Sequence, residues 1–160
     1  MKDPDTPLIF LDIDGVLNGH QFDKKSQSNL IDIESVGWLN RIILHTDAKI
    51  VLSSAWRYMV LGGAMTLQGF EYMLRTHGVH CVDRLIGHTC SDEEIGERGG
   101  QITHWRYANG HKGRYAVIDD MDLNISGVHP FVRTDGEVGL TFRDMRLAVG
   151  ILGESDRRTA

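Results

Sequence analysis

The sequence has little cysteine, no long apolar run and fewer basic than acidic residues. Its two cysteines, Cys81 and Cys90, are too few for a disulfide framework and lack the C-x-x-C spacing of a metal site. No run approaches the roughly 20 apolar residues that span a bilayer. The polar start, MKDPDTP, is not a signal peptide. We therefore expect a cytoplasmic protein in a thiol-reducing compartment, without membrane association.

The charge balance excludes another class of protein. With 17 Lys+Arg against 22 Asp+Glu, the formal net charge is -5, which argues against a surface coated all over with nucleic acid. Local basic patches remain compatible with this charge. A chain of 160 residues with 41% hydrophobic residues can bury one core. We expect a single domain over residues 1–160, with its core in about 8–150.

Five β-compatible runs alternate with segments of helical or loop composition. They are LIFLDI (8–13), AKIVLSS (48–54), RLIGHT (84–89), RYAVIDD (114–120) and FVRTD (131–135). Apolar periodicity predicts helices within 32–46, 65–79 and 99–110, whereas 19–29 and 58–63 have the composition of surface loops. Strands alternating with helices favour an α/β fold with a parallel sheet.

Two of the predicted strands end in paired acids, Asp12 with Asp14 and Asp119 with Asp120. The carboxyl ends of parallel strands meet at the sheet edge where open α/β folds bind ligands. Clustered carboxylates repel one another, and Mg²⁺ prefers carboxylate, water and phosphate oxygens. The pairs therefore predict a magnesium site, although a single aspartate in such a position more often only caps a helix or turn.

A third strand end carries hydroxyl groups. The run IVLSSAWR places Ser53 and Ser54 at its end and Arg57 shortly after. The hydroxyls can donate to a phosphoryl oxygen, and the guanidinium offers a two-pronged donor for the same group. The alternative is that a serine only caps the following helix.

These segments resemble a known superfamily. DIDGVLN, LSSAWR and VIDD, in this order, resemble motifs one, two and four of the haloacid dehalogenase (HAD) phosphotransferases. More narrowly, FLDIDGVLN, LSSAWR, DRLIGHT, ERGGQITHW, VIDD and VRTD…GLT resemble small HAD-type domains associated with RNA-repair proteins. The resemblance extends from Leu8 to about Thr141. It implies a Rossmann-like three-layer sandwich with a mainly parallel central sheet.

The resemblance also implies a mechanism. Asp12 attacks the substrate phosphorus and forms an aspartyl-phosphate, which splits one difficult hydrolysis into two steps. Asp14 serves as the general acid and then as the general base. Ser53 binds the phosphate through its hydroxyl, and Ser54 and Asp14 add backbone amide donors.

The same resemblance implies Mg²⁺ as cofactor. The ligands are the carboxylate of Asp12, the backbone carbonyl of Asp14 and the Asp119–Asp120 pair, with Asp120 in direct contact. The bound cation screens the repulsion between the anionic nucleophile and the phosphate.

The third motif of the superfamily is a lone Lys or Arg that binds the phosphate. Arg98 occupies the position that the narrower resemblance favours, and Lys112 and Arg114 are alternatives nearer the last acidic strand. For these two, a solvated turn, NGHKGR, is the more ordinary interpretation.

The expected substrate, a nucleic-acid end, is what the narrower resemblance implies, and the small size of the chain is compatible with it. There is room only for a minimal cap, a short flap within 15–33, so the site is open to bulky phosphates. Between Arg98 and Arg114, basic residues alternate with Trp105 and Tyr107, which suits nucleic acid, although an amphipathic helix with Trp105 in the core explains them as well. We expect a phosphatase for RNA or DNA 3'-phosphate ends that works beside a repair kinase or ligase. The alternatives are a phosphatase for a small metabolite or nucleotide and a non-catalytic phosphate-binding module.

Overall fold

A computed structural model describes residues 3–20 and 31–155 and contains one parallel sheet. Its strands are β1 (Leu8–Leu11), β2 (Lys49–Leu52), β3 (Leu85–His88), β4 (Tyr115–Asp119) and β5 (Phe131–Arg133). Neighbours pair in parallel in the order β3-β2-β1-β4-β5. The five predicted strands and the α/β class are therefore confirmed.

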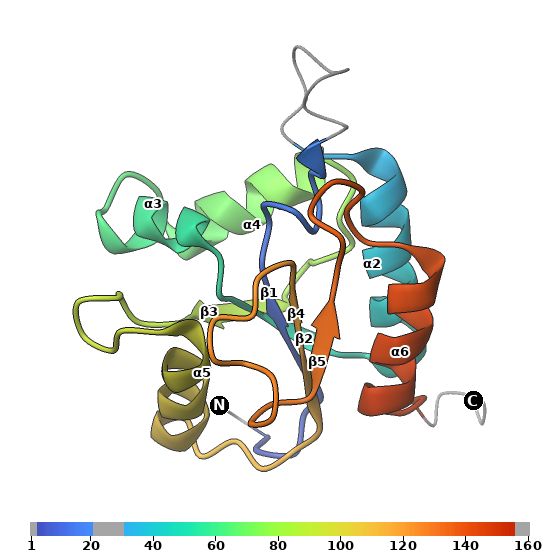
Figure 1. Ribbon diagram of the computed structural model, residues 1–160. Helices are drawn as coiled ribbons and strands as arrows, with labels where there is room; N and C mark the ends of the chain where they lie inside the picture. Colours follow the sequence, from blue (N-terminus) through green and yellow to red (C-terminus); the bar gives the residue numbers. More distant parts are fainter. Residues whose placement is uncertain (1–2, 21–30, 156–160) are drawn as a thin grey trace.

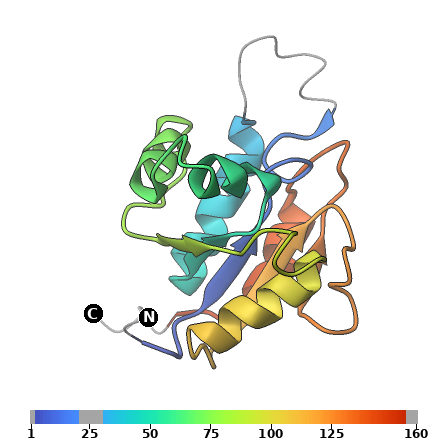
Figure 2. The same cartoon turned by 90° about the vertical axis from the view of Figure 1, so that its left-hand side faces the viewer.

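Helices cover both faces of this sheet (Figure 1). They are α2 (Ile33–Thr46), α3 (Tyr58–Leu61), α4 (Leu67–Thr76), α5 (Arg98–Ala108) and α6 (Phe142–Leu152), with a 3-10 turn, η1 (Ala55–Arg57). Helices α2 and α6 pack against each other on one face, and α5 covers the opposite face (Figures 1 and 2). This arrangement confirms the three-layer, Rossmann-like sandwich.

The central strand β1 is buried on both sides. Side chains alternate between the two faces along a strand, so Leu8 and Phe10 point toward α5 and pack with Trp105. Ile9 and Leu11 point the other way, into the larger cluster shared with α2 and α6. An uninterrupted apolar run is typical of a strand that helices cover on both faces.

Two helices differ from the sequence-based expectation. The segment 58–63, predicted as a loop, contains the short helix α3, which continues directly from η1. Helix α6 was not predicted, although its start carries a signal: the Thr141 hydroxyl accepts from the Asp144 amide, and the Asp144 carboxylate accepts from the Thr141 amide. This reciprocal capping is encoded in a Thr-x-x-Asp spacing.

Two sequence-based expectations fall mostly outside the residues that the structure describes. Most of the flap predicted within 15–33, and most of the loop predicted over 19–29, fall on residues 21–30, which lie outside the described part of the chain. Within residues 3–20 and 31–155, no helix combines the length and the apolar character that a membrane crossing needs.

Candidate active site

The carboxyl edge of the sheet aims three polar side chains at the side covered by α5. Asp119 ends β4, and Asp12 and Ser53 directly follow β1 and β2. The sheet ladder continues to these positions, because Asp12 N–H donates to Ile118 O and Ser53 N–H to Leu11 O, each at 3.0 Å. Side chains alternate between the two faces along a strand, so all three side chains point to the face on which Phe10 packs with α5.

Three carboxylates converge at this edge. One oxygen each from Asp12, Asp119 and Asp120 lies within 4.8 Å of the other two. The Asp119 side chain is 0% exposed and that of Asp12 is 7% exposed. Such a group of carboxylate oxygens, two of them from buried residues, fits a hard divalent cation such as Mg²⁺. The Asp14 carboxylate is not part of this group, and a contact through the Asp14 carbonyl stays a prediction.

The electrostatics of this carboxylate cluster (Asp12, Asp119 and Asp120) also favour a cation. Burial, followed by the charge of Asp12, raises the pKa of Asp119 from 3.8 to about 6. The same two causes raise the pKa of Asp120. Raised pKa values indicate negative charge that the protein alone does not fully compensate, and a bound divalent cation compensates it.

We predict that the metal-free protein is more stable at about pH 5 than at about pH 7.5. The folded pKa of Asp119, about 6, lies above its ordinary value of 3.8, so the folded state holds more protons between these values. Stability therefore falls as the pH rises through this window. Thermal unfolding in chelator and in excess Mg²⁺ tests this, and Mg²⁺ is expected to restore stability at the higher pH.

The control for this prediction is Asp119→Asn, which lacks the most buried of the three carboxyl groups. Its stability is expected to change less between the two pH values than that of the wild type. A metal-free wild type that gains stability from pH 5 to 7.5 contradicts the prediction.

Arg98 brings positive charge to the cluster. Its Nη1 lies 3.1 Å from an Asp12 oxygen and also donates to Asp119. Burial opposes the charge, but Asp12 and Asp119 outweigh it and raise the pKa of the Arg98 guanidinium. The two alternatives, Lys112 and Arg114, precede β4 and so lie at the opposite, amino edge of the sheet. Of these three basic residues, the structure brings Arg98 to the acids.

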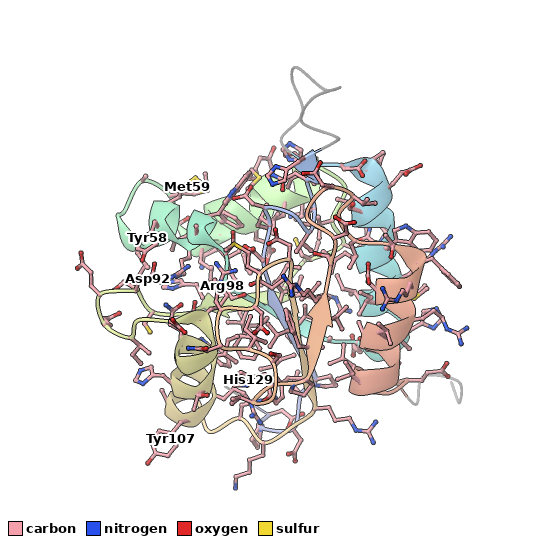
Figure 3. The ribbon with its side chains drawn as sticks, viewed as in Figure 1. Tyr58, Met59, Asp92, Arg98, Tyr107 and His129 are labelled. Carbon is pink, nitrogen blue, oxygen red and sulfur yellow. The ribbon has the colours of Figure 1, made fainter. Side chains whose placement is uncertain are left out.

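The first turn of α5 is held tightly against the segment that follows β4. Gly99 N–H donates to Leu123 O at 3.0 Å, and His129 Nε2 donates to Gly99 O at 2.8 Å. A Cβ at Gly99 would lie 1.9 Å from Asn124 O, so a side chain there is excluded. This close approach directs Arg98 toward the end of β4, above His129 in Figure 3.

Asp120 lies in a slot between two glycines. A Cβ at Gly15 would lie 2.4 Å from Asp120 Cγ, and one at Gly136 would lie 2.6 Å from Asp120 Oδ2. The Thr134 hydroxyl donates to Gly15 O at 2.8 Å and joins the turn after β1 to the end of β5. The backbone of two loops thus shapes the position of this carboxylate.

Ser53 and Ser54 have different surroundings. Within residues 3–20 and 31–155, Ser53 Oγ is the buried side-chain polar atom that has no hydrogen-bond partner. Because such atoms are normally paired, this hydroxyl is available to donate to a bound group. The Ser54 hydroxyl instead accepts from Trp56 N–H at 3.3 Å and caps η1. For Ser54 this is the alternative interpretation, in which a serine caps the following helix. A phosphate contact through the Ser54 amide stays a prediction.

The geometry does not support the prediction that Arg57 binds phosphate. The residue is 1% exposed, and its guanidinium donates to Ser54 O and Cys90 O at 2.9 Å each. It also pairs with Asp92 at 2.6 Å. Its donors are thus engaged within the protein, and Arg57 braces the turn that carries the serines. A sequence motif shows residue type but not the direction of a long side chain.

Asp14 is exposed and is held by two donors that the sequence-based interpretation did not assign. Asn18 Nδ2 donates to Asp14 Oδ1 at 2.9 Å, and Trp56 Nε1 donates to Asp14 Oδ2 at 2.8 Å. The four-residue spacing from Asp14 is a local signal for Asn18. No local signal exists for Trp56, which comes from another strand end.

The basic and aromatic segment 98–114 does not act as one surface at the site. Trp105 is 8% exposed and packs in the core, which is the alternative interpretation. The Arg106 guanidinium lies 3.8 Å from the centre of the Tyr115 ring. Tyr107 is at the end of α5 opposite Arg98 (Figure 3).

Comparison with known proteins yields one family. No curated protein and no solved structure matches the chain significantly. The model of the family described as the HAD domain in Swiss Army Knife RNA repair proteins matches residues 8–145. This stretch includes the carboxylate cluster, Arg98 and both serines. The chain therefore belongs to this family of HAD domains.

Proposed function

We propose that the protein is a Mg²⁺-dependent phosphomonoester hydrolase that acts on a nucleic-acid end such as a polynucleotide 3'-phosphate. The observation that carries this proposal is the placement of the unpaired Ser53 hydroxyl on the same sheet face as the carboxylate cluster. A phosphoryl group offers oxygens to the hydroxyl and phosphorus to a carboxylate. Both demands of the site are thus met by one ligand.

Asp12 is the nucleophile of this reaction. Its carboxylate oxygen forms a bond to phosphorus while the bond from phosphorus to the leaving oxygen breaks, and Asp14 gives that oxygen a proton. Asp14 then takes a proton from a water molecule that attacks the aspartyl-phosphate. The bond between phosphorus and Asp12 breaks, inorganic phosphate leaves, and both residues return to their starting states.

The remaining residues hold the phosphoryl group and balance its charge. Ser53 donates its hydroxyl to a phosphoryl oxygen, and Arg98 provides positive charge beside the nucleophile. The carboxylate cluster and the Asp14 carbonyl would hold Mg²⁺, which when bound would screen the repulsion between the anionic nucleophile and the phosphate. A cation at the cluster would also offset the burial and the charge of Asp12 that raise the pKa of Asp119.

The proposed substrate class rests on the family, whose description names RNA repair. A 3'-phosphate at a nucleic-acid end blocks ligation, so its removal suits a system that also contains a kinase or a ligase. The test compares a 3'-phosphorylated oligonucleotide with the matching nucleoside 3'-monophosphate in Mg²⁺. We expect kcat/KM to be more than about tenfold higher for the oligonucleotide. The opposite preference indicates a small-molecule phosphatase, and no turnover of either compound or of an aryl phosphate indicates a binding module.

Ser53→Ala is expected to lower kcat/KM about 10²-fold, because it removes a donor to the phosphoryl group. The same change is expected to leave stability unchanged or slightly higher, since it deletes a buried hydroxyl without a partner. Steady-state kinetics and thermal unfolding measure the two effects.

Ser35→Ala is the matched control for Ser53→Ala. The Ser35 hydroxyl is also buried but donates to Asp32 at 3.2 Å, so its loss is expected to reduce stability and spare activity. A Ser53→Ala enzyme with wild-type kcat/KM contradicts the assigned role.

A further inference from the structure

We propose that Trp56 is a positioning residue that aims the Asp14 carboxylate at the leaving group. The inference rests on the proposed function, because it takes Asp14 as the residue that protonates the leaving oxygen. It adds a residue that the motifs of the sequence do not assign.

The orientation of Asp14 is set from its own turn on one side. Gly15 N–H donates to Asn18 Oδ1 at 3.1 Å, so the amide oxygen of Asn18 is engaged and its Nδ2 faces Asp14 Oδ1 at 2.9 Å. Each end of the amide thus has a complementary partner, which determines how the amide is turned. This contact alone leaves the second carboxylate oxygen of Asp14 unconstrained.

Trp56 constrains that second oxygen. Its Nε1–H, which can only donate, lies 2.8 Å from Asp14 Oδ2. The indole is itself anchored, because it packs on the main core and meets the Phe70 ring edge-to-face, with 6.3 Å between ring centres. With Asn18 donating to one oxygen and Trp56 to the other, the plane of the Asp14 carboxylate is defined. An exposed aspartate is thereby held in one direction.

The turn that presents Trp56 also presents the phosphate-binding hydroxyl. Ser53 lies three residues before Trp56, and the intervening Ser54 caps the Trp56 amide at 3.3 Å. Arg57 donates to Ser54 O at 2.9 Å and ties the turn to Cys90 and Asp92. One braced turn therefore sets both the phosphate contact and the direction of Asp14.

The consequence depends on the leaving group. A sugar alkoxide leaves poorly and needs a well-placed proton, whereas an aryl oxide such as p-nitrophenolate leaves with little help. Loss of the Trp56 N–H lets the exposed Asp14 side chain rotate about its bond to the backbone. Cleavage of alkyl phosphates should then suffer far more than cleavage of aryl phosphates.

The experiment uses Trp56→Phe, which removes the N–H and keeps an aromatic ring against Phe70. We expect kcat/KM for a 3'-phosphorylated oligonucleotide to fall about tenfold or more, and kcat/KM for p-nitrophenyl phosphate to fall less than about threefold. We compare kcat/KM for both substrates because this parameter covers the steps up to the departure of the leaving group, and not the later hydrolysis of the aspartyl-phosphate. Trp56→Leu is measured in parallel and is expected to show the same discrimination, so the result does not depend on one variant folding.

Trp38→Phe is the matched control, since it replaces another half-buried indole, on helix α2, and is expected to leave both substrates unaffected. In an Asp14→Asn background, Trp56→Phe should cause no further loss. If Asp14→Asn retains wild-type cleavage of the oligonucleotide, the acid–base role of Asp14 is wrong and the present inference falls with it. If the wild type releases phosphate from neither substrate, the proposed function itself fails. If Asp14→Asn is inactive but the Trp56 variants lower both substrates equally or neither, only the present inference is overturned.

Discussion

Asp12→Asn is expected to abolish phosphate release, with kcat lower by on the order of 10⁴-fold or more. The amide has nearly the same shape as the carboxylate but cannot form the aspartyl-phosphate. The measurement is Mg²⁺-dependent release of inorganic phosphate from an aryl phosphate and from a 3'-phosphorylated oligonucleotide. Both substrates should fail equally, because without the Asp12 carboxylate neither leaving group is displaced from phosphorus.

The same variant is expected to be at least as stable as the wild type in chelator at about pH 7.5. It removes one of three carboxylates that repel one another, and Arg98 keeps its contact with Asp119. Thermal unfolding therefore shows whether a loss of phosphate release comes from the missing nucleophile or from an unfolded protein. Asp83→Asn, at an exposed position before β3, is the control for removing a negative charge. An Asp12→Asn enzyme as active as the wild type rules out the proposed catalysis.

Arg98→Met is expected to impair both activity and stability. Without its guanidinium, Asp119 and Asp12 stay buried beside each other with no cation between them. Breaking a buried ion pair by removing one partner costs about 3 kcal/mol. For a chain of this size the melting temperature should fall by roughly 6 to 12 °C in chelator at about pH 7.5.

Magnesium separates the two roles of Arg98. Bound Mg²⁺ should restore much of the lost stability of Arg98→Met, because it neutralises the same carboxylates, but kcat/KM should remain at least about 10²-fold below the wild type. Arg114→Met is the matched control. Its exposed side chain, at the amino edge, is expected to affect stability by less than about 0.5 kcal/mol and to spare activity. Equal losses in both variants contradict the assignment of Arg98.

The amino-acid sequence alone predicts the order of the strands and of the acids that follow them. Apolar β-compatible runs bury themselves wherever helices can cover both faces, and all five were confirmed as strands. A parallel sheet collects the ends of its strands at one edge, so Asp12, Ser53 and Asp119 were bound to be neighbours once the strands were recognised. The start of helix α6 is also encoded locally, in the Thr141–Asp144 capping pair.

The direction of long side chains and the approach of distant segments depended on the tertiary structure. Arg98 reaches the acids because Gly99 lets α5 lie against the residues after β4, whereas Arg57, just as basic, is drawn into bracing its own turn. The Trp56 contact to Asp14 joins residues 42 positions apart. The sequence by itself determined the strands and the acids at their ends, because burial and the alternation of side chains are local properties. Only the tertiary structure decided which cation and which donor meet those acids, because these contacts depend on how separate segments pack.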